Sequence, residues 1–333
     1  MIRPSAYSGT CRIECPPSYL IRLSGNSGQK MYGASILNRC IPGMNHIDRV
    51  YEGELGSKQE MVCHQCVVTK VADLQGNRIV KDYTHKPLSF RITSHVDVPA
   101  GGGLGTSSTL VVSILGAFIE WLKLPLGEYD IARLAYEIER VDLGLLGGKQ
   151  DQYAATFGGF NYMQFSKDNQ VLVNPLRIKA NYQTELAHNL LLFYTQTSHV
   201  SAEIIKGQVE NMQQKNADAM EAMHLIKRQT ELMKEVLLRG EIDKIGDILN
   251  FSWEQKKKTA QNISNPLLED IYETALKAGA TGGKISGAGG GGFMFFYCPN
   301  VSRYTVEREL VKNFKGEVKR YEFTQIGLET WTI

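Results

Sequence analysis

The stretch Val98-Pro99-Ala100-Gly101-Gly102-Gly103-Leu104-Gly105-Thr106-Ser107-Ser108-Thr109 decides how this chain folds. Four of the five positions 101–105 are glycine, which lets the backbone approach a ligand closely and adopt conformations closed to other residues. Residues 89–93 alternate between apolar and polar, as in a strand with one buried face. Apolar residues then recur at helical spacing from Leu110 to Leu122. The stretch therefore predicts a strand, a glycine loop and the start of a helix.

This order of elements favours a phosphate-binding loop. The free N–H groups and the positive dipole end of a helix N-terminus attract an anion. We expect Thr106, Ser107 or Ser108 to be the N-cap of the helix. Their hydroxyls are also suited to a phosphate-bound Mg²⁺, a hard cation that takes oxygen ligands. From the residues alone, a flexible surface turn before an ordinary amphipathic helix stays open as the alternative.

Two better-known phosphate loops are excluded. A Walker A loop ends in Gly-Lys-Ser/Thr, and no lysine follows these glycines. A dinucleotide-binding fingerprint needs a glycine where Thr106 stands. Residues 287–292 do fit Gly-x-Gly-x-x-Gly, but the strand pattern of residues 293–297 follows them instead of a helix. That second match is therefore accidental.

Length and composition describe a globular chain of 333 residues, enough for one large domain or two. The balance of 37 basic and 35 acidic residues gives a net charge of +2, so no broad attraction to nucleic acid or to a membrane surface is expected. The apolar run 110–119 is too short to span a bilayer, and the N-terminus has no apolar signal core. We expect a cytoplasmic protein; a homodimer is one assembly that the sequence leaves open.

Cysteine is concentrated near the N-terminus, with five of the six cysteines in the first 66 residues. Cys11 and Cys15 together with Cys63 and Cys66 are compatible with a four-thiolate zinc site, a redox pair or unpaired thiols. Prolines and the absence of a helical stripe make residues 1–75 atypical of the rest of the chain.

Periodicity predicts the elements along the chain. We expect helices at about 107–122, 128–141, 202–238, 241–251, 266–278 and 301–313, and a helical or turn segment at 77–83. We expect strands at 20–23, 61–68, 88–94, 161–165, 170–173, 189–195 and 317–323, with strand patterns on both sides of residues 282–292. A domain boundary is expected at 175–184.

Three further features are candidates for a functional site. Glu137 and Glu139 lie near the end of a predicted helix, where the dipole disfavours acids, so they are either solvated or hold a cation. Asp151 lies in the first turn of a short predicted helix, where capping is the alternative explanation. Residues 282–292 contain seven glycines in eleven positions, which favours close backbone packing against a ligand or a second loop.

Three motifs in this order resemble those of the GHMP small-molecule kinase superfamily, which includes galactokinase, homoserine kinase and mevalonate kinase. Residues 98–109 match its phosphate loop Pro-x-Gly-x-Gly-Leu-Gly-Ser-Ser, residues 148–153 match a second motif, and residues 284–292 match its C-terminal glycine motif. The likeness covers residues 77–333. Within the superfamily, residues 124–129, 134–140, 147–153, 157–160 and 174–176 are most similar to bacterial heptose 7-phosphate kinases.

The resemblance implies an α+β, two-domain fold with the active site between the domains. An N-terminal ATP-binding domain like domain 2 of ribosomal protein S5 would span 1–180, and a ferredoxin-like C-terminal GHMP kinase domain would span 181–333. ATP and Mg²⁺ are implied as cofactors. The implied ATP-binding residues are Pro99, Gly101, Gly102, Gly103, Leu104, Gly105, Thr106, Ser107, Ser108, Gly287, Ala288, Gly289 and Gly290. Ser107 and Glu139 would bind Mg²⁺, and Asp151 would be the catalytic residue that orients or deprotonates the acceptor hydroxyl.

The implied reaction is ATP-dependent phosphorylation of the anomeric hydroxyl of D-glycero-D-manno-heptose 7-phosphate, a sugar phosphate, to the 1,7-bisphosphate. The family opens with a strand and a glycine loop that contribute to the sugar site, and residues 1–75 do not match them. Three alternatives therefore stay open: another sugar resembling galactose or fucose, a mevalonate-type alcohol, or a relative that binds nucleotide or sugar without catalysis.

Overall fold

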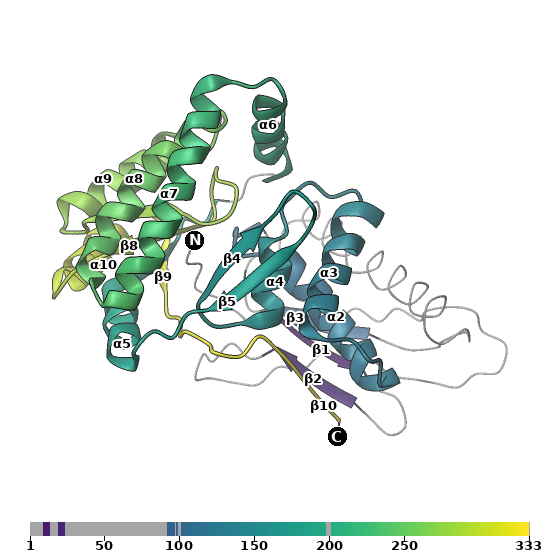
Figure 1. The fold of residues 1–333 in the computed structure, drawn as a ribbon. Coiled ribbons are helices and arrows are strands. Elements are labelled where there is room, and N and C mark those ends of the chain that lie inside the picture. The colour runs from purple at the N-terminus through teal and green to yellow at the C-terminus, as the bar shows by residue number, and fades with distance from the viewer. Residues whose placement is uncertain are drawn as a thin grey trace. The chain divides into compact units, whose positions relative to one another are not determined.

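The structure, a computed structural model, describes residues 9–13, 19–23, 92–96, 98, 101–197 and 201–332. These residues form two compact units (Figure 1). The first unit contains the strands of residues 9–96 together with residues 105–159 and 323–332, and the second contains residues 101–104 and 160–322. The chain passes from the second unit into the first between Leu104 and Gly105, inside the predicted phosphate loop.

The first unit has a four-stranded antiparallel sheet of order β10-β2-β1-β3. Its strands are β1 (Gly9–Ile13), β2 (Tyr19–Leu23), β3 (Ile92–Val96) and β10 (Leu328–Thr332). Helix α2 (Thr106–Leu122) contacts strands of this sheet and also the helices α3 (Glu128–Tyr136) and α4 (Gln150–Phe157) (Figure 1). Because it is covered on all sides, α2 is apolar around most of its circumference, and every residue from Leu110 to Phe118 is buried.

A π-helical segment, η2 (Glu137–Asp142), continues α3. The helix predicted at 128–141 is therefore confirmed in its extent, but its last turn is wider than an α-helical turn. Such π-helical turns are rare and occur frequently at functional sites, because the extra residue changes which side chains face inward. Here Glu139 is buried, although it is a carboxylate near a helix C-terminus.

The second unit has an antiparallel sheet of order β7-β8-β6-β9 and a separate hairpin. The sheet contains β6 (Leu190–Tyr194), β7 (Gly282–Ile285), β8 (Phe293–Tyr297) and β9 (Glu317–Lys319), and the hairpin contains β4 (Asn161–Phe165) and β5 (Val171–Pro175). Every residue of the inner strand β8 is buried. This explains why residues 293–297 form a continuous apolar run instead of alternating with polar residues.

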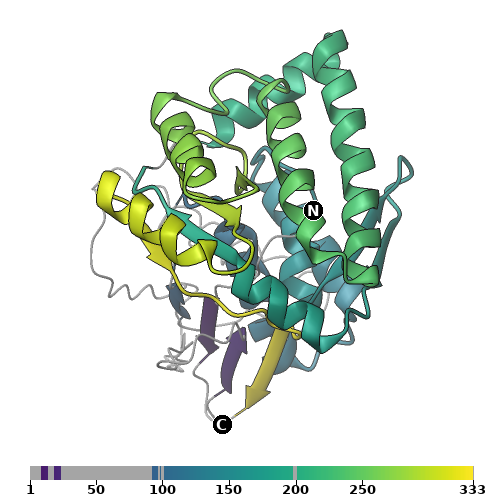
Figure 2. The same ribbon diagram turned by 90° about the vertical axis from the view of Figure 1, so that its left-hand side faces the viewer.

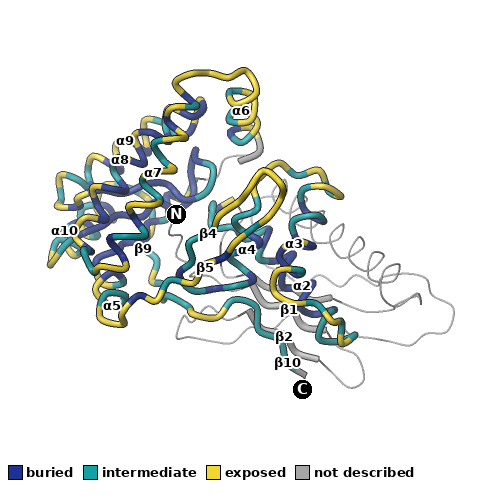
Figure 3. Tube along the Cα trace, in the orientation of Figure 1, coloured by how far each residue is buried: buried dark blue, intermediate teal, exposed yellow. Residues whose placement is uncertain are grey.

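Helices pack against this second sheet and against one another (Figure 2). They are α5 (Ala180–Asn189), α6 (Ser201–Gln213), α7 (Ala217–Arg239), η3 (Ile242–Lys244), α8 (Ile245–Lys257), α9 (Pro266–Lys277) and α10 (Ser302–Asn313). Helices α7 and α8 pack side by side, and α9 packs against α10 (Figure 2). Each unit has its own hydrophobic core: one centred on α2, the other on β6, β8 and Trp253 of α8 (Figure 3). The predicted α+β class is confirmed.

The long helix predicted at 202–238 is wrong, because two helices occupy this stretch. Helix α6 ends at Gln213, and α7 begins at Ala217. Lys215 has a left-handed backbone (φ 53°), which a helix cannot continue. The side chain of Asn216 then accepts a hydrogen bond from the Ala219 N–H and caps α7. The helical periodicity continues across this break, but the capping signal of Asn216 marks the new start.

Other predicted elements are confirmed with shifted ends, and two differ more. The predicted boundary at 175–184 contains the beginning of α5, and the strand predicted at 317–323 ends at Lys319. The strand at 61–68, the segment at 77–83 and the alternatives for the N-terminal cysteines lie outside the described residues and side chains. A domain division at residue 180 stays a prediction; the compact units change over at Phe160, and β10 belongs to the first. Among the described helices, none is long and apolar enough to cross a bilayer.

Candidate active site

The N-terminus of α2 carries no side-chain cap. Its N-cap is Gly105, in a left-handed conformation (φ 80°, ψ 19°) that glycine adopts at little cost. The prediction that Thr106, Ser107 or Ser108 caps the helix is therefore wrong, because the helix begins one residue earlier. The hydroxyls of both serines point to another partner, described below, so the N–H groups of the first turn face no capping side chain. This end of α2 has the features of an anion-binding site.

Glu139 of η2 is the partner of both serines. Its Oε1 accepts a hydrogen bond from the Ser107 hydroxyl at 2.7 Å, and its Oε2 accepts one from the Ser108 hydroxyl at 2.7 Å. Only 1% of the Glu139 side chain is exposed. A buried carboxylate destabilises a protein unless it is hydrogen-bonded and paired. The hydrogen bonds from the two serines therefore stabilise Glu139 in this position. Of the two explanations for Glu137 and Glu139, solvation is excluded for Glu139, whereas Glu137 pairs with Arg133 on the outer side of the helix.

Arg140, the neighbour of Glu139, connects this carboxylate to the loop before α4. Its guanidinium donates to the backbone carbonyls of Leu146 (3.2 Å) and Gly148 (3.4 Å), and one nitrogen lies 3.5 Å from Glu139 Oε1. The loop approaches the arginine so closely that a Cβ at Gly147 would lie 2.6 Å from Arg140 Cζ. A side chain at this position would therefore displace the Arg140 guanidinium from its contacts with the loop.

Asp151 lies in the first turn of α4, as predicted, and beside the start of α2. A Cβ placed on Gly105 would be 3.1 Å from Asp151 Cγ, so the absence of a side chain at Gly105 admits the carboxylate. Asp151 is partly exposed, in contrast to the buried Gln152 that follows it. The next residue, Tyr153, is not a candidate base, because burial raises the pKa of its phenol and keeps it protonated.

In the second unit, two glycine loops pack backbone against backbone. The first is residues 101–104, and the second is residues 286–292 between β7 and β8. A Cβ on Gly103 would lie 2.7 Å from the Ser286 carbonyl oxygen, and one on Gly287 would lie 2.7 Å from the Gly103 Cα. Ser286 donates its hydroxyl to the Gly103 carbonyl at 2.9 Å. The predicted close packing of residues 282–292 against a second loop is therefore confirmed.

Replacing Gly103 with alanine should destabilise the protein by about 1–3 kcal/mol more than replacing Gly144. Both glycines have positive φ (76° and 67°), so both substitutions bring backbone strain of about 1 kcal/mol. Only Gly103 faces another backbone, whereas nothing lies within 4 Å of a Cβ at Gly144. Thermal unfolding of both variants by calorimetry measures the difference. Equal losses would contradict the packing of the two loops.

The end of α8 and the segment that follows it hold the loop 286–292 in place through hydrogen bonds. The Gly290 N–H donates to the Ile263 carbonyl at 2.8 Å, and the Asn265 side chain donates to the Gly290 carbonyl at 3.2 Å. The buried Lys256 donates its ammonium to the Gly287 carbonyl. These contacts explain how a loop so rich in glycine keeps one conformation.

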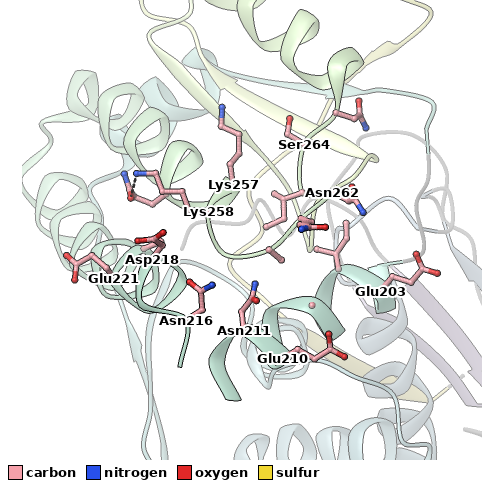
Figure 4. Close-up of a pocket in the computed structure, with 18 of the residues that line it drawn as sticks. Glu203, Glu210, Asn211, Asn216, Asp218, Glu221, Lys257, Lys258, Asn262 and Ser264 are labelled. Carbon is pink, nitrogen blue, oxygen red and sulfur yellow. Dashed lines mark hydrogen bonds between the residues drawn. The ribbon is translucent and has the colours of Figure 1, made fainter. Parts of the chain in front are cut away.

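The same segment also lines a cavity of about 1530 Å³ (Figure 4). It is lined by α6, the beginning of α7, the end of α8 and residues 258–267, with side chains of both charges such as Glu203, Glu210 and Lys258. It contains none of the predicted site residues. Periodicity did not reveal it, because the polar faces of separate helices resemble solvated surfaces in the sequence.

The predicted site residues fall into the two units as follows. Gly105, Thr106, Ser107, Ser108, Glu139 and Asp151 gather at the start of α2 in the first unit. Gly101, Gly102, Gly103, Leu104, Gly287, Ala288, Gly289 and Gly290 belong to the paired loops of the second unit. Pro99 lies outside the described residues. Sequence reasoning gave no role to Arg140 or Gln152, although each adjoins a predicted site residue.

The oxygen atoms around Ser107 fit a magnesium ion. Mg²⁺ takes hard oxygen ligands, and proteins usually bind it through one or two carboxylates together with substrate phosphates. Glu139 supplies a buried carboxylate, and Ser107 supplies a hydroxyl in contact with it at the anion-binding end of α2. Among the described residues no group of three His, Cys, Asp or Glu side chains is placed to hold a metal.

The arrangement is that of a phosphate-binding enzyme site, and comparison with known proteins identifies the family. The GHMP kinases N terminal domain matches residues 67–159, and the GHMP kinases C terminal domain matches residues 233–316. The chain is 49% identical over 259 residues to a D-glycero-alpha-D-manno-heptose 7-phosphate kinase from Campylobacter jejuni, covering 77% of this chain and 75% of the relative. The chain belongs to the GHMP kinase family.

Solved structures agree with this assignment. A crystal structure of a D-glycero-D-manno-heptose 1-phosphate kinase from Bacteroides thetaiotaomicron is similar at 34% identity and a TM-score of 0.67, with 98% of each chain covered. A mevalonate kinase from L. major, at 17% identity and a TM-score of 0.62, covers 98% of this chain and 94% of its own, and shares the fold alone. The predicted family and the predicted GHMP kinase fold are confirmed.

Proposed function

We propose that this chain transfers the γ-phosphoryl group of ATP to the anomeric hydroxyl of D-glycero-D-manno-heptose 7-phosphate. The observation that carries the kinase part is the buried Glu139, bonded to Ser107 and Ser108 at an uncapped helix N-terminus with Asp151 beside it. The acceptor rests on the 49% identity to a relative named for this substrate.

The phosphates of ATP would be held by backbone amides. At the start of α2, the N–H groups of the first turn and the helix dipole attract negative charge. Phosphoryl transfer requires positioning and charge neutralisation more than covalent chemistry, so a site built of amides and one carboxylate is sufficient.

Ser107 and Glu139 would hold Mg²⁺ through the serine hydroxyl and a carboxylate oxygen. Bound there, the ion would neutralise charge on the phosphate oxygens. The buried position of Glu139 keeps its negative charge unscreened by water and therefore effective.

Asp151 would orient the acceptor hydroxyl and take its proton. In the reaction, the anomeric oxygen forms a bond to the γ-phosphorus, the bond from that phosphorus to the β–γ bridging oxygen breaks, ADP leaves, and the hydroxyl proton passes to the Asp151 carboxylate. Its partial exposure leaves the carboxylate accessible, and its place in the first turn of α4 keeps it near the start of α2.

The names of the relatives differ in where the acceptor already carries phosphate, so the test compares both. With ATP and Mg²⁺, the purified protein should release ADP with the highest kcat/KM when heptose 7-phosphate is the acceptor. Heptose 1-phosphate, unphosphorylated heptose, galactose, fucose and mevalonate form the comparison panel, and phosphorus NMR identifies the product as the 1,7-bisphosphate. A higher kcat/KM with another acceptor would contradict the substrate assignment. ATP binding by calorimetry without ADP release on any acceptor would contradict the enzymatic function.

A further inference from the structure

Gln152 occupies the centre of the contacts around Glu139. Its amide nitrogen donates to Glu139 Oε2 at 2.5 Å and to the Ser108 hydroxyl oxygen at 3.1 Å. None of its surface is exposed. One buried amide therefore connects α4, which carries Asp151, to the carboxylate of η2 and to the first turn of α2.

The orientation of this amide carries a cost. Both amide hydrogens have partners, but the Gln152 Oε1 atom is buried without a hydrogen-bond donor among the described residues. A buried polar atom left unpaired costs about 1–3 kcal/mol. Turning the amide over would relieve nothing, because its oxygen would then face the Glu139 carboxylate. Gln152 is fully buried and leaves one polar atom unpaired, which lowers stability. Such a residue in a folded protein indicates a functional role.

We propose that Gln152 is a positioning residue that holds Glu139 in the orientation in which it binds Mg²⁺. Oε2 is occupied by Ser108 and Gln152, so the carboxylate cannot rotate, and Oε1 is kept on the side of Ser107. The inference rests on the proposed function, since it concerns the same magnesium ligands. Partners that orient a metal ligand typically contribute about 10–100-fold to metal affinity or activity.

The pH dependence of Gln152→Glu distinguishes positioning from a structural role. The introduced carboxyl has nearly the same shape but, when ionised, places a second negative charge against Glu139 and donates no hydrogen bond. Two carboxylates in contact raise the pKa of one of them, so in mild acid a proton is retained and a hydrogen bond can be donated to Glu139 again. Relative to the wild type, the activity of this variant should be about 10–100-fold lower at alkaline pH and should recover as the pH falls.

Two further variants serve as controls. Gln152→Met fills the same space without a donor or a titrating group, so its loss should not recover in acid. Gln170→Glu makes the same charge change at an exposed position just before β5 and should behave as the wild type. The affinity of each nucleotide-loaded protein for Mn²⁺, measured by electron paramagnetic resonance, gives a readout independent of turnover. It should weaken about 10–100-fold in Gln152→Met, with the KM for the sugar phosphate unchanged.

Three results would overturn the proposal: Gln152→Glu equal to Gln170→Glu, losses in Gln152→Glu and Gln152→Met with the same pH dependence, or unchanged Mn²⁺ affinity in Gln152→Met. Should Gln152→Glu fail to fold, Gln152→Asn keeps the amide and shortens it by one methylene. The folded Gln152→Asn variant should then bind Mn²⁺ more weakly than the wild type. An unchanged Mn²⁺ affinity would overturn the inference. Failure of the proposed function is distinct, because the wild type itself would then show no turnover.

Discussion

The Asp151→Asn variant should retain the fold and lose about 10²–10⁴-fold in kcat. Asparagine has the same shape as aspartate but cannot accept the proton of the acceptor hydroxyl. Asp151 lies in the first turn of α4 beside Gly105, a position that asparagine can occupy without a change in packing. The KM for ATP should change little, because the phosphates would be held by backbone amides. Steady-state kinetics, together with a thermal unfolding curve, measures both effects.

The matched control for this prediction is Asp270→Asn, the same change at an exposed position of α9. It should leave kcat unchanged. A kcat for Asp151→Asn within about tenfold of the wild type would show that Asp151 is not the proton acceptor, since a positioned general base contributes roughly 10²–10⁴-fold.

The second large effect is expected for Glu139→Gln, which should lower both activity and stability. Removing the negative charge should lower kcat/KM by about 10²-fold or more, because the site loses the carboxylate that would bind Mg²⁺. The unfolding temperature should also fall, because one oxygen and one NH2 group would replace the two carboxylate oxygens that accept hydrogen bonds from Ser107, Ser108 and Gln152. Kinetics as a function of Mg²⁺ concentration and calorimetry test the two parts.

Glu137→Gln is the control in the same helical segment. Glu137 pairs with Arg133 on the outer side, so its replacement should affect neither activity nor the Mg²⁺ requirement. A fall in the unfolding temperature of Glu139→Gln with kcat/KM and the Mg²⁺ requirement unchanged would instead indicate that Glu139 is only a structural residue. Exposed ion pairs contribute about 0–1 kcal/mol, so the control should also melt close to the wild type.

Local patterns in the sequence were sufficient to predict the loop and three of the residues gathered at the start of α2: Ser107, Glu139 and Asp151. The glycine run followed by an apolar helix predicts an anion-binding helix start. The resemblance to the family implied the metal-binding and catalytic roles of these residues, which stay predictions. The capping prediction failed because hydroxyls in the first turn of a helix have two alternatives. They bond either to the helix N–H groups or to a distant acceptor, and here Glu139 is the acceptor.

Arg140 and Gln152 were not predicted, although they lie beside predicted residues. Each has one partner far away in the sequence: Gln152 and Ser108 are 44 positions apart, and Arg140 and Ser108 are 32 apart. Nothing in the pattern around Gln152 distinguishes a buried amide from a solvated one. Only the packing of α2 against α4 and η2 decides that this amide faces a carboxylate.

By itself, the sequence determined where the chain turns, which segments become helices or strands, and that residues 282–292 must pack closely against something. Backbone conformation depends mainly on neighbouring residues, so these properties can be predicted from short stretches of sequence. The tertiary structure decided that the partner of that glycine run is the loop at 101–104, that Glu139 is buried, and that Gln152 holds it. Such pairings depend on how distant segments meet in the folded core, which no local pattern specifies.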